Sequence, residues 1–131
     1  MRKIYIAFLL IFFLLIFSVK AFGTGEKIPE ETLIEFLEIE VPEIKKMGAK
    51  INKKSKGKSY ITVFLDGSPD NNGKDKYEKE YYRIYVGEQQ GSDTVNICWF
   101  LIHKDTKEIL FWDSYDDKYS TLDEWRSEMK K

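Results

Sequence analysis

The sequence has few of the residues that metal sites, disulfides and many hydrolytic sites require. Its 131 residues include one cysteine, Cys98, and one histidine, His103. One cysteine cannot form a disulfide within the chain. A zinc site needs three or four nitrogen or sulfur ligands, which these two residues do not supply. The sequence therefore predicts no metal site and no cofactor.

Cys98 and His103 are also unsuited to act as a catalytic pair. Cys98 lies in the apolar run 95–102, which favours a small buried hydrophobe over a reactive thiol or an intermolecular bridge. The two residues are five positions apart, so on one strand their side chains point to opposite faces. A Ser–His or Cys–His site would have to use this histidine. We therefore expect a protein without enzymatic activity.

The first 23 residues look like an export segment. Two basic residues precede an unbroken apolar run over residues 4–17, which is shorter than the roughly 20 residues of a comfortable membrane span. The sequence predicts a signal peptide over residues 1–23 and a single domain over residues 24–131. The protein would then be secreted or periplasmic, and an uncleaved membrane anchor is the alternative.

Charge argues against a nucleic-acid partner. The chain has 21 basic and 22 acidic residues, and residues 1–23 hold three of the basic ones and no acidic one. The remaining domain would keep 18 basic residues and a net charge of −4, whereas nucleic-acid-binding domains usually present a basic patch. Residues 45–58 contain seven lysines. A solvated loop is the expectation there, with an anionic partner or membrane surface as the alternative.

The remaining pattern predicts a helix, four strands and a short final helix. Apolar residues recur at helical spacing over residues 33–41, Pro42 should kink or restart the helix, and Gly48 is a candidate end. Runs rich in aromatic and β-branched residues mark the strands, at 60–65, 81–86, 95–103 and 108–113. Short connections predict pairing in sequence order. Thr121 and Glu124 suit a capping box for the final helix.

These elements predict an α+β domain in which a curled four-stranded antiparallel meander packs on a kinked N-terminal helix. The order of elements resembles the cystatin-like and NTF2-like groups of small domains. The hairpin WFLIHKDTKEILFWD resembles the strand–turn–strand that closes PepSY-type domains of exported bacterial proteins, with Lys107 in place of their usual turn glycine. The resemblance covers residues 30–113 in element order only. It implies a non-enzymatic role as an inhibitor, immunity protein or binding module.

Side-chain alternation predicts a second apolar face on the sheet. One face of the second strand, with Tyr82, Ile84 and Val86, suits a core. The third and fourth strands are apolar on both faces, and alternation groups Ile97 with Trp99. Since one helix covers one face, the other face gathers the candidate binding residues Tyr81, Arg83, Tyr85, Trp99 and Trp112. Exposed aromatic patches mark binding surfaces, and Tyr, Trp and Arg are enriched at hot spots.

Three hypotheses follow. The first is an exported binding protein that engages a protein partner in the cell envelope or outside the cell through this face, with membrane contact only through residues 1–23 if uncleaved. The helix, the C-terminal segment or a dimer would cover the face if it only packs. The second is a small-ligand carrier with an apolar pocket between sheet and helix. The third is an enzyme, which a cleft with converging acids around Asp113 would support.

The loop over residues 66–76 has the composition of a calcium loop without its pattern. Aligning Gly73 with the invariant loop glycine of an EF-hand puts Lys79 where the bidentate glutamate must lie. A solvated turn is therefore the expectation for this segment.

Overall fold

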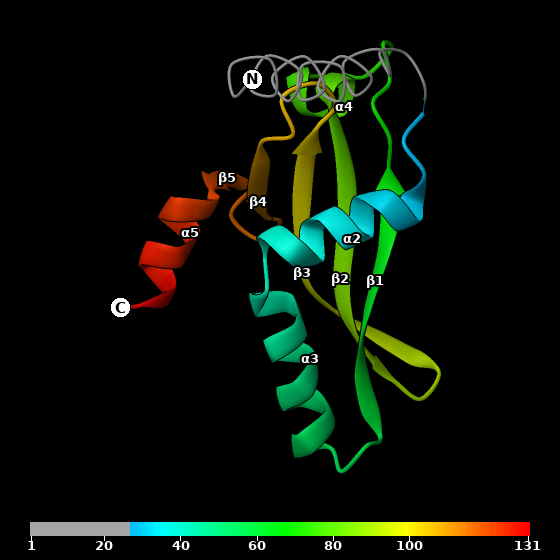
Figure 1. Ribbon diagram of the computed structural model, residues 1–131, viewed down its shortest axis with the longest axis vertical. Coiled ribbons are helices and arrows are strands. Elements are labelled where there is room, and N and C mark those ends of the chain that lie inside the picture. Colours follow the sequence, from blue (N-terminus) through cyan, green and yellow to red (C-terminus); the bar gives the residue numbers. More distant parts are fainter. Residues whose placement is uncertain (1–26) are drawn as a thin grey trace, which may run out of the picture.

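A computed structural model describes residues 27–131 as an α+β domain built on one antiparallel sheet (Figure 1). The elements in chain order are α2 (Glu30–Glu40), α3 (Glu43–Lys54), β1 (Ser59–Gly67), α4 (Lys76–Glu80), β2 (Tyr81–Gln90), β3 (Asp93–His103), β4 (Ile109–Asp113), β5 (Lys118–Thr121) and α5 (Leu122–Met129). The strands pair in sequence order from β1 to β5. The predicted export segment, residues 1–23, lies outside the described residues. Among the helices described, none is long and apolar enough to cross a membrane.

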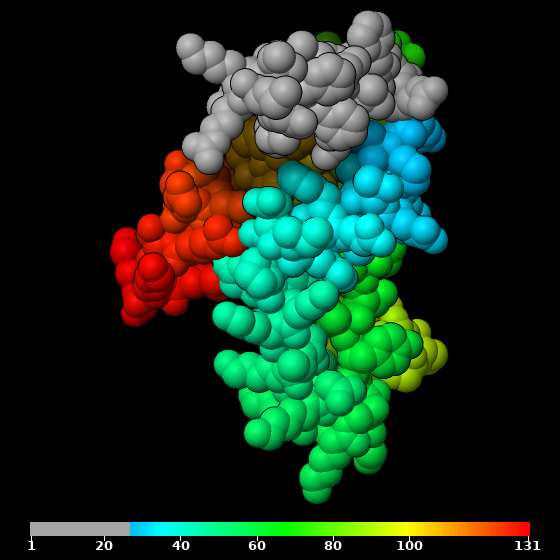
Figure 2. Space-filling view, in the orientation of Figure 1, coloured from blue at the N-terminus to red at the C-terminus, as the bar shows by residue number. Residues whose placement is uncertain are grey.

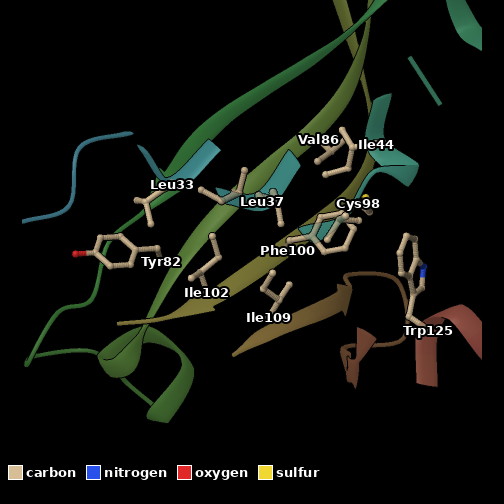
Figure 3. Close-up of a cluster of buried hydrophobic side chains, with 12 residues drawn as sticks. Leu33, Leu37, Ile44, Tyr82, Val86, Cys98, Phe100, Ile102, Ile109 and Trp125 are labelled. Carbon is tan, nitrogen blue, oxygen red and sulfur yellow. The ribbon is translucent and has the colours of Figure 1, made fainter. Parts of the chain in front are cut away.

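The main core lies between the sheet and its cover of α2 and α3, which occupy the near face of the molecule in Figure 2. Figure 3 shows Leu33 and Leu37 of α2 pointing at the inner face of β2 and β3, where Phe100 is fully buried. The predicted core side chains of β2, Tyr82, Ile84 and Val86, are buried there, so that prediction is confirmed. Full burial of one such side chain contributes about 1.5–3 kcal/mol.

The N-terminal helical segment is two helices and not the single kinked helix of the predicted architecture, so of the two effects predicted for Pro42, a kink or a restart, the restart occurs. Pro42 separates them, because the residue before a proline avoids the helical region, and Val41 has φ −125° and ψ 72°. The prediction that α3 ends at Gly48 was wrong. The helix continues to Lys54, so most of the lysine-rich segment is helical and not a loop. Gly48 lies against β1, where an added Cβ would sit 2.7 Å from Cγ2 of Ile61.

The sheet has five strands, one more than predicted. The additional strand, β5, is four residues long and pairs with β4 in a tight hairpin, Asp113 opposite Lys118. The predicted helix that follows is confirmed: the Thr121 hydroxyl accepts a hydrogen bond from the backbone N–H of Glu124 at 3.2 Å. The short helix α4, inside the segment predicted to connect the first two strands, was not predicted.

A β-bulge in β3 changes which way Ile97 points. Val86 pairs with Cys98 and Gly87 pairs with Asn96, so Ile97 is the extra residue. It lies beside Met47 of α3, on the core side of the sheet. The grouping of Ile97 with Trp99 by simple alternation was therefore wrong.

The edge strand β1 is blocked near one end by a side chain of α2 and near the other by Ser55, the residue that follows α3. The Ser59 N–H donates to the Ser55 hydroxyl at 2.8 Å, and the Leu65 N–H donates to a carboxylate oxygen of Glu30 at 3.2 Å. Unpaired edge groups otherwise invite pairing with another chain. These contacts leave only the middle of β1 open for pairing with a strand of another chain.

Arg126 connects α5 to the junction of α2 and α3. Its Nε and Nη2 donate to the two carboxylate oxygens of Glu43 at 2.7 and 3.1 Å, and Nη2 also donates to the Glu40 carbonyl at 2.8 Å. The hydrogen bonds from Arg126 lower the pKa of Glu43. The forked geometry needs a guanidinium, because a lysine ammonium cannot contact both oxygens in this planar way.

We expect Arg126→Lys to lower the free energy of unfolding at pH 7 by about 1.5–3 kcal/mol, the value of one hydrogen bond to a charged group. Because the folded-state pKa of Glu43 is depressed, its contribution is present above the unfolded pKa and is lost as pH falls through the folded pKa. The difference in free energy of unfolding between wild type and Arg126→Lys, measured with urea, should therefore be smaller at about pH 3 than at pH 7. The matched control is Lys118→Met, which removes the exposed pair with Glu128 and should cost about 0–1 kcal/mol. Equal losses for Arg126→Lys at both pH values would contradict this account.

Candidate functional site

The face of the sheet turned away from α2 and α3 carries a row of aromatic side chains across all five strands. Strand register places one ring on each strand opposite the next, in the order Phe64, Tyr85, Trp99, Trp112 and Tyr119. The centroids of neighbouring rings are 4.6, 5.4, 5.2 and 6.1 Å apart. These are contact distances for aromatic pairs. We call these five side chains the aromatic row.

Two carboxylates hold the tryptophans of the row in place. The Trp99 Nε1–H donates to Asp66 at 3.0 Å, and the Trp112 Nε1–H donates to Asp117 at 3.0 Å. The Arg83 Nε lies 3.2 Å from the same Asp66 oxygen, an ion pair without hydrogen-bond alignment. The Arg83 guanidinium also lies 6.0 Å from the Trp112 ring centroid. Both indoles therefore have restricted orientations before anything binds.

The Tyr85 side chain lies over Gly87, two residues further along the same strand, because a glycine leaves room for its ring. A Cβ on Gly87 would sit 2.6 Å from the Cε1 and Cζ atoms of the Tyr85 ring, so a larger residue there would displace the ring. The Tyr85 hydroxyl donates to the Asn96 side-chain oxygen at 2.7 Å. Burial, followed by the charge of Asp66, raises the pKa of Tyr85.

Helix α4 covers one end of this face and forms a second small core there. Tyr81, Leu101 and Leu110 are buried, and Tyr77 of α4 packs against them. The Tyr77 ring stacks on Tyr119 with centroids 3.6 Å apart. The Tyr81 hydroxyl donates to a Glu108 carboxylate oxygen at 2.9 Å. Burial and this carboxylate raise the pKa of Tyr81 well above its usual range.

The structure brings all five predicted binding residues to this one face, with unequal access to solvent. Tyr81 and Tyr85 are only 8% and 6% exposed, so they support the surface from beneath. Arg83, Trp99 and Trp112 are half-buried and accessible.

Sequence reasoning missed two members of the row. Phe64, on β1, is 40% exposed. Alternation along the first predicted strand separates Phe64 from Val63, but nothing in the sequence shows which of the two faces is the face of Trp99. Tyr119 was missed because β5 was not predicted. Its recognisable signal was the alternation of Lys118, Tyr119 and Ser120, which is too short to stand out.

A pocket of about 370 Å³ opens beside the row, between the loop that follows β1 and the hairpin of β4 and β5. Its aromatic wall is formed by Tyr77, Trp112 and Tyr119. Its carboxylates are Asp70, Asp75, Glu78 and Asp117, and Arg83 is the one cation among the lining residues. Within residues 27–131, none of these four carboxylates forms an ion pair with a lysine, arginine or histidine.

Each of these carboxylates accepts a hydrogen bond through one of its two oxygens. Asp70 accepts from the Asn72 N–H, Asp75 and Glu78 accept from backbone N–H groups of α4 and its preceding loop, and Asp117 accepts from the Trp112 indole. The residues that line the pocket therefore carry a net negative charge. Burial, followed by the charges of Asp75 and Asp117, raises the pKa of Tyr119 to about 12.

The residues singled out for catalysis or metal binding do not converge. Cys98 is buried in the main core, and burial raises its pKa to about 12. His103 lies at the end of β3 against the Tyr81 ring, and its Nδ1 accepts two backbone hydrogen bonds at 3.1 Å. The two side chains are on opposite faces, as predicted. Asp113 accepts from the N–H groups of Tyr115 and Asp116 in its own turn.

In the described part of the chain, no three histidine, cysteine, aspartate or glutamate side chains are grouped so that they could hold a metal ion.

Gly87→Ala is expected to lower the free energy of unfolding by about 1–3 kcal/mol, the usual cost of forcing extra volume into a packed site. The reason is the collision with the Tyr85 ring, so the cost should fall by at least about 0.5 kcal/mol when the same change is made in a Tyr85→Ala background. Urea unfolding of the four proteins measures this coupling, and near-ultraviolet circular dichroism reports the displaced ring. The same cost in both backgrounds would show that Gly87 does not support the row.

Comparison of the chain with protein-family models, with curated proteins and with solved structures finds no match. The resemblance to cystatin-like and NTF2-like domains therefore stays a prediction, and the function must be argued from the geometry of this face.

Proposed function

We propose that this chain is a non-enzymatic binding protein that engages a protein partner through the aromatic row and the adjacent pocket. The observation that carries the proposal is the asymmetry of the sheet. Helices α2 and α3 close one face, whereas the other face presents aromatic rings that remain accessible, with Phe64 exposed and Trp99 and Trp112 half-buried. Large aromatic side chains of this kind contribute most of the energy at many protein interfaces.

The fixed orientation of the rings supports this proposal. Asp66 and Asp117 each accept an indole N–H, and Arg83 pairs with Asp66. Ordering a mobile side chain at an interface costs about 0.5–1.5 kcal/mol, and side chains that are already ordered avoid much of that cost. The centre of the row is therefore suited to act as a preformed contact surface.

The charges of the pocket indicate what the partner presents. Four carboxylates and one arginine line it, beside the stacked rings of Tyr77 and Tyr119. A lysine or arginine side chain would gain both ionic attraction and cation–π contact there. We therefore propose a partner that inserts a basic side chain into the pocket and lays an apolar surface on the row. An inhibitor or immunity protein would use such a surface.

The place of action is proposed from the sequence. Residues 1–23 have the features of an export segment, so the partner would lie in the cell envelope or outside the cell. A secreted or periplasmic location and a protein held by an uncleaved segment are equally compatible with this surface.

The carrier hypothesis has less support from the geometry. It requires an apolar cavity between sheet and helix, but Leu33, Leu37 and Phe100 fill the space between α2 and the sheet and are at most 2% exposed. Beside α3 there is an open groove, and its lining includes Lys50, Lys54 and Glu88. The pocket beside the aromatic row lies on the opposite face and is walled by charged groups. A protein partner is the better fit.

The test compares two exposed apolar residues on opposite sides of the molecule. Phe64→Ser removes the outermost ring of the row, and Ile39→Ser makes a similar change on α2, where Ile39 is 76% exposed. Ile39→Ser should change stability by less than about 0.5 kcal/mol. Phe64→Ser also removes the ring contact with Tyr85 and should cost about 0.5–1.5 kcal/mol, so urea unfolding must show that both variants are folded in the assay. In pull-downs from extracts of the cells that make the protein, wild type and Ile39→Ser should retain the same partner. Phe64→Ser should retain at least about tenfold less, a loss of about 1.4 kcal/mol.

Equal retention by all three proteins would reject the aromatic row as the contact surface. A second copy of the chain could also cover this face. Light scattering on the purified protein tests this, because a dimer formed through the face would dissociate in Phe64→Ser and not in Ile39→Ser. That result would replace a foreign partner with a second copy of the chain.

A further inference from the structure

A second concave surface lies on the other side of the sheet, where α3 and the hairpin of β2 and β3 diverge at the end of the molecule far from α4 (Figure 1). It is a groove of about 680 Å³. Met47 and Ile51 of α3 and Ile97 of β3 form its apolar surface, and Lys50 and Lys54 stand along its α3 side. Glu88 of β2 also lines the groove. We call this surface the α3 groove.

The apolar part of the groove depends on the bulge in β3. The extra residue at this bulge, Ile97, is 38% exposed and lies beside Met47 and Ile51. Further along the hairpin, Val95 is also exposed. The packing of α3 against β1 at Gly48 and Ile61 is tight, so the groove opens only where the hairpin departs from the helix.

Positive charge is concentrated beside this groove. Residues 45–58 contain seven lysines and no acidic residue, in a chain whose net charge is −1. Among the described residues, Lys45 is the one lysine of this segment with an ion pair, to Glu38 at 3.8 Å. The helix dipole favours Lys53 and Lys54 in the last turn, but it does not account for Lys46 or Lys50. Like charges so close together repel one another, which an anionic ligand would relieve.

We infer that the α3 groove binds an acidic peptide segment of a protein partner. An apolar side chain of that segment lies against Met47, Ile51 and Ile97, and carboxylates on either side of it contact Lys50 and Lys54. The volume of the groove falls within the range of ligand-binding pockets, about 300–1,000 Å³. Charge complementarity then selects acidic over basic segments and speeds their association.

Glu88 favours a peptide over a phosphate-rich surface. Glu88 is the one acidic residue that lines the groove, so phosphates of a phospholipid membrane or a nucleic acid pressed over the groove would meet a like charge. An extended peptide need not carry a carboxylate at every position. The part that lies beside Glu88 can be uncharged, and its backbone N–H groups can donate to Glu88. The groove and the aromatic row lie on opposite faces, so occupation of one leaves the other free.

The test uses a short fluorescent synthetic peptide in which leucine and phenylalanine alternate with glutamate and aspartate, and measures anisotropy with the full domain. The wild-type protein should bind it, with affinity falling as salt is raised. Lys50→Gln combined with Lys54→Gln should weaken binding at least about fivefold, and Ile97→Ser should weaken it at least about threefold. The matched control combines Lys56→Gln and Lys58→Gln, an equal charge change beyond the end of α3, and should have little effect.

Two further probes decide between kinds of ligand. Vesicles of phosphatidylglycerol and a single-stranded oligonucleotide should bind more weakly than the peptide. The inference is overturned if either binds and the peptide does not, if the peptide fails to bind at concentrations up to about 1 mM, or if the control pair weakens binding as much as Lys50→Gln with Lys54→Gln. Far-ultraviolet circular dichroism on each variant confirms that α3 is intact.

Discussion

Side chains alternate along a strand, and in this chain β3 and β4 are apolar on both faces while the helices α2 and α3 cover only one. The organisation of the domain follows from that constraint. On the covered face, Leu37, Phe100 and Ile102 form a dry core. On the other face the apolar side chains need another solution, because large uncovered apolar areas favour association with other molecules.

Apolar side chains on this second face are shielded from water in two ways. At one end α4 folds back and buries Tyr81 and Leu101 beneath Tyr77. Across the middle the aromatic row covers itself, since each ring packs on its neighbours, and such pairs contribute about 0.5–1.5 kcal/mol beyond simple burial. Gly87 leaves room for Tyr85 to lie flat, and Asp66 and Asp117 satisfy the indole N–H groups. The result is a surface whose rings are packed against one another and whose Phe64, Trp99 and Trp112 stay at least partly exposed.

Much of this could be predicted because its signals are local. Pro42 marks the break between α2 and α3, Thr121 caps α5, and the alternation in β2 separates Tyr82 from Tyr81. What could not be predicted depends on tertiary contacts or on very short elements. The role of Gly48 comes from its approach to β1, and the direction of Ile97 comes from a bulge that no local pattern marks. The pocket depends on α4 and β5, which have five and four residues.

The two concave surfaces carry opposite charge on opposite faces, carboxylates beside the aromatic row and lysines beside the α3 groove. We propose that the aromatic row contacts a protein partner in the cell envelope or outside the cell. The most direct test replaces Phe64 with the photo-crosslinker p-benzoylphenylalanine, which keeps a ring at that position, and irradiates cells that make the protein. We expect a discrete crosslinked product from position 64 and none from the same replacement at Ile39. No product from position 64, or the same product from both positions, would contradict it.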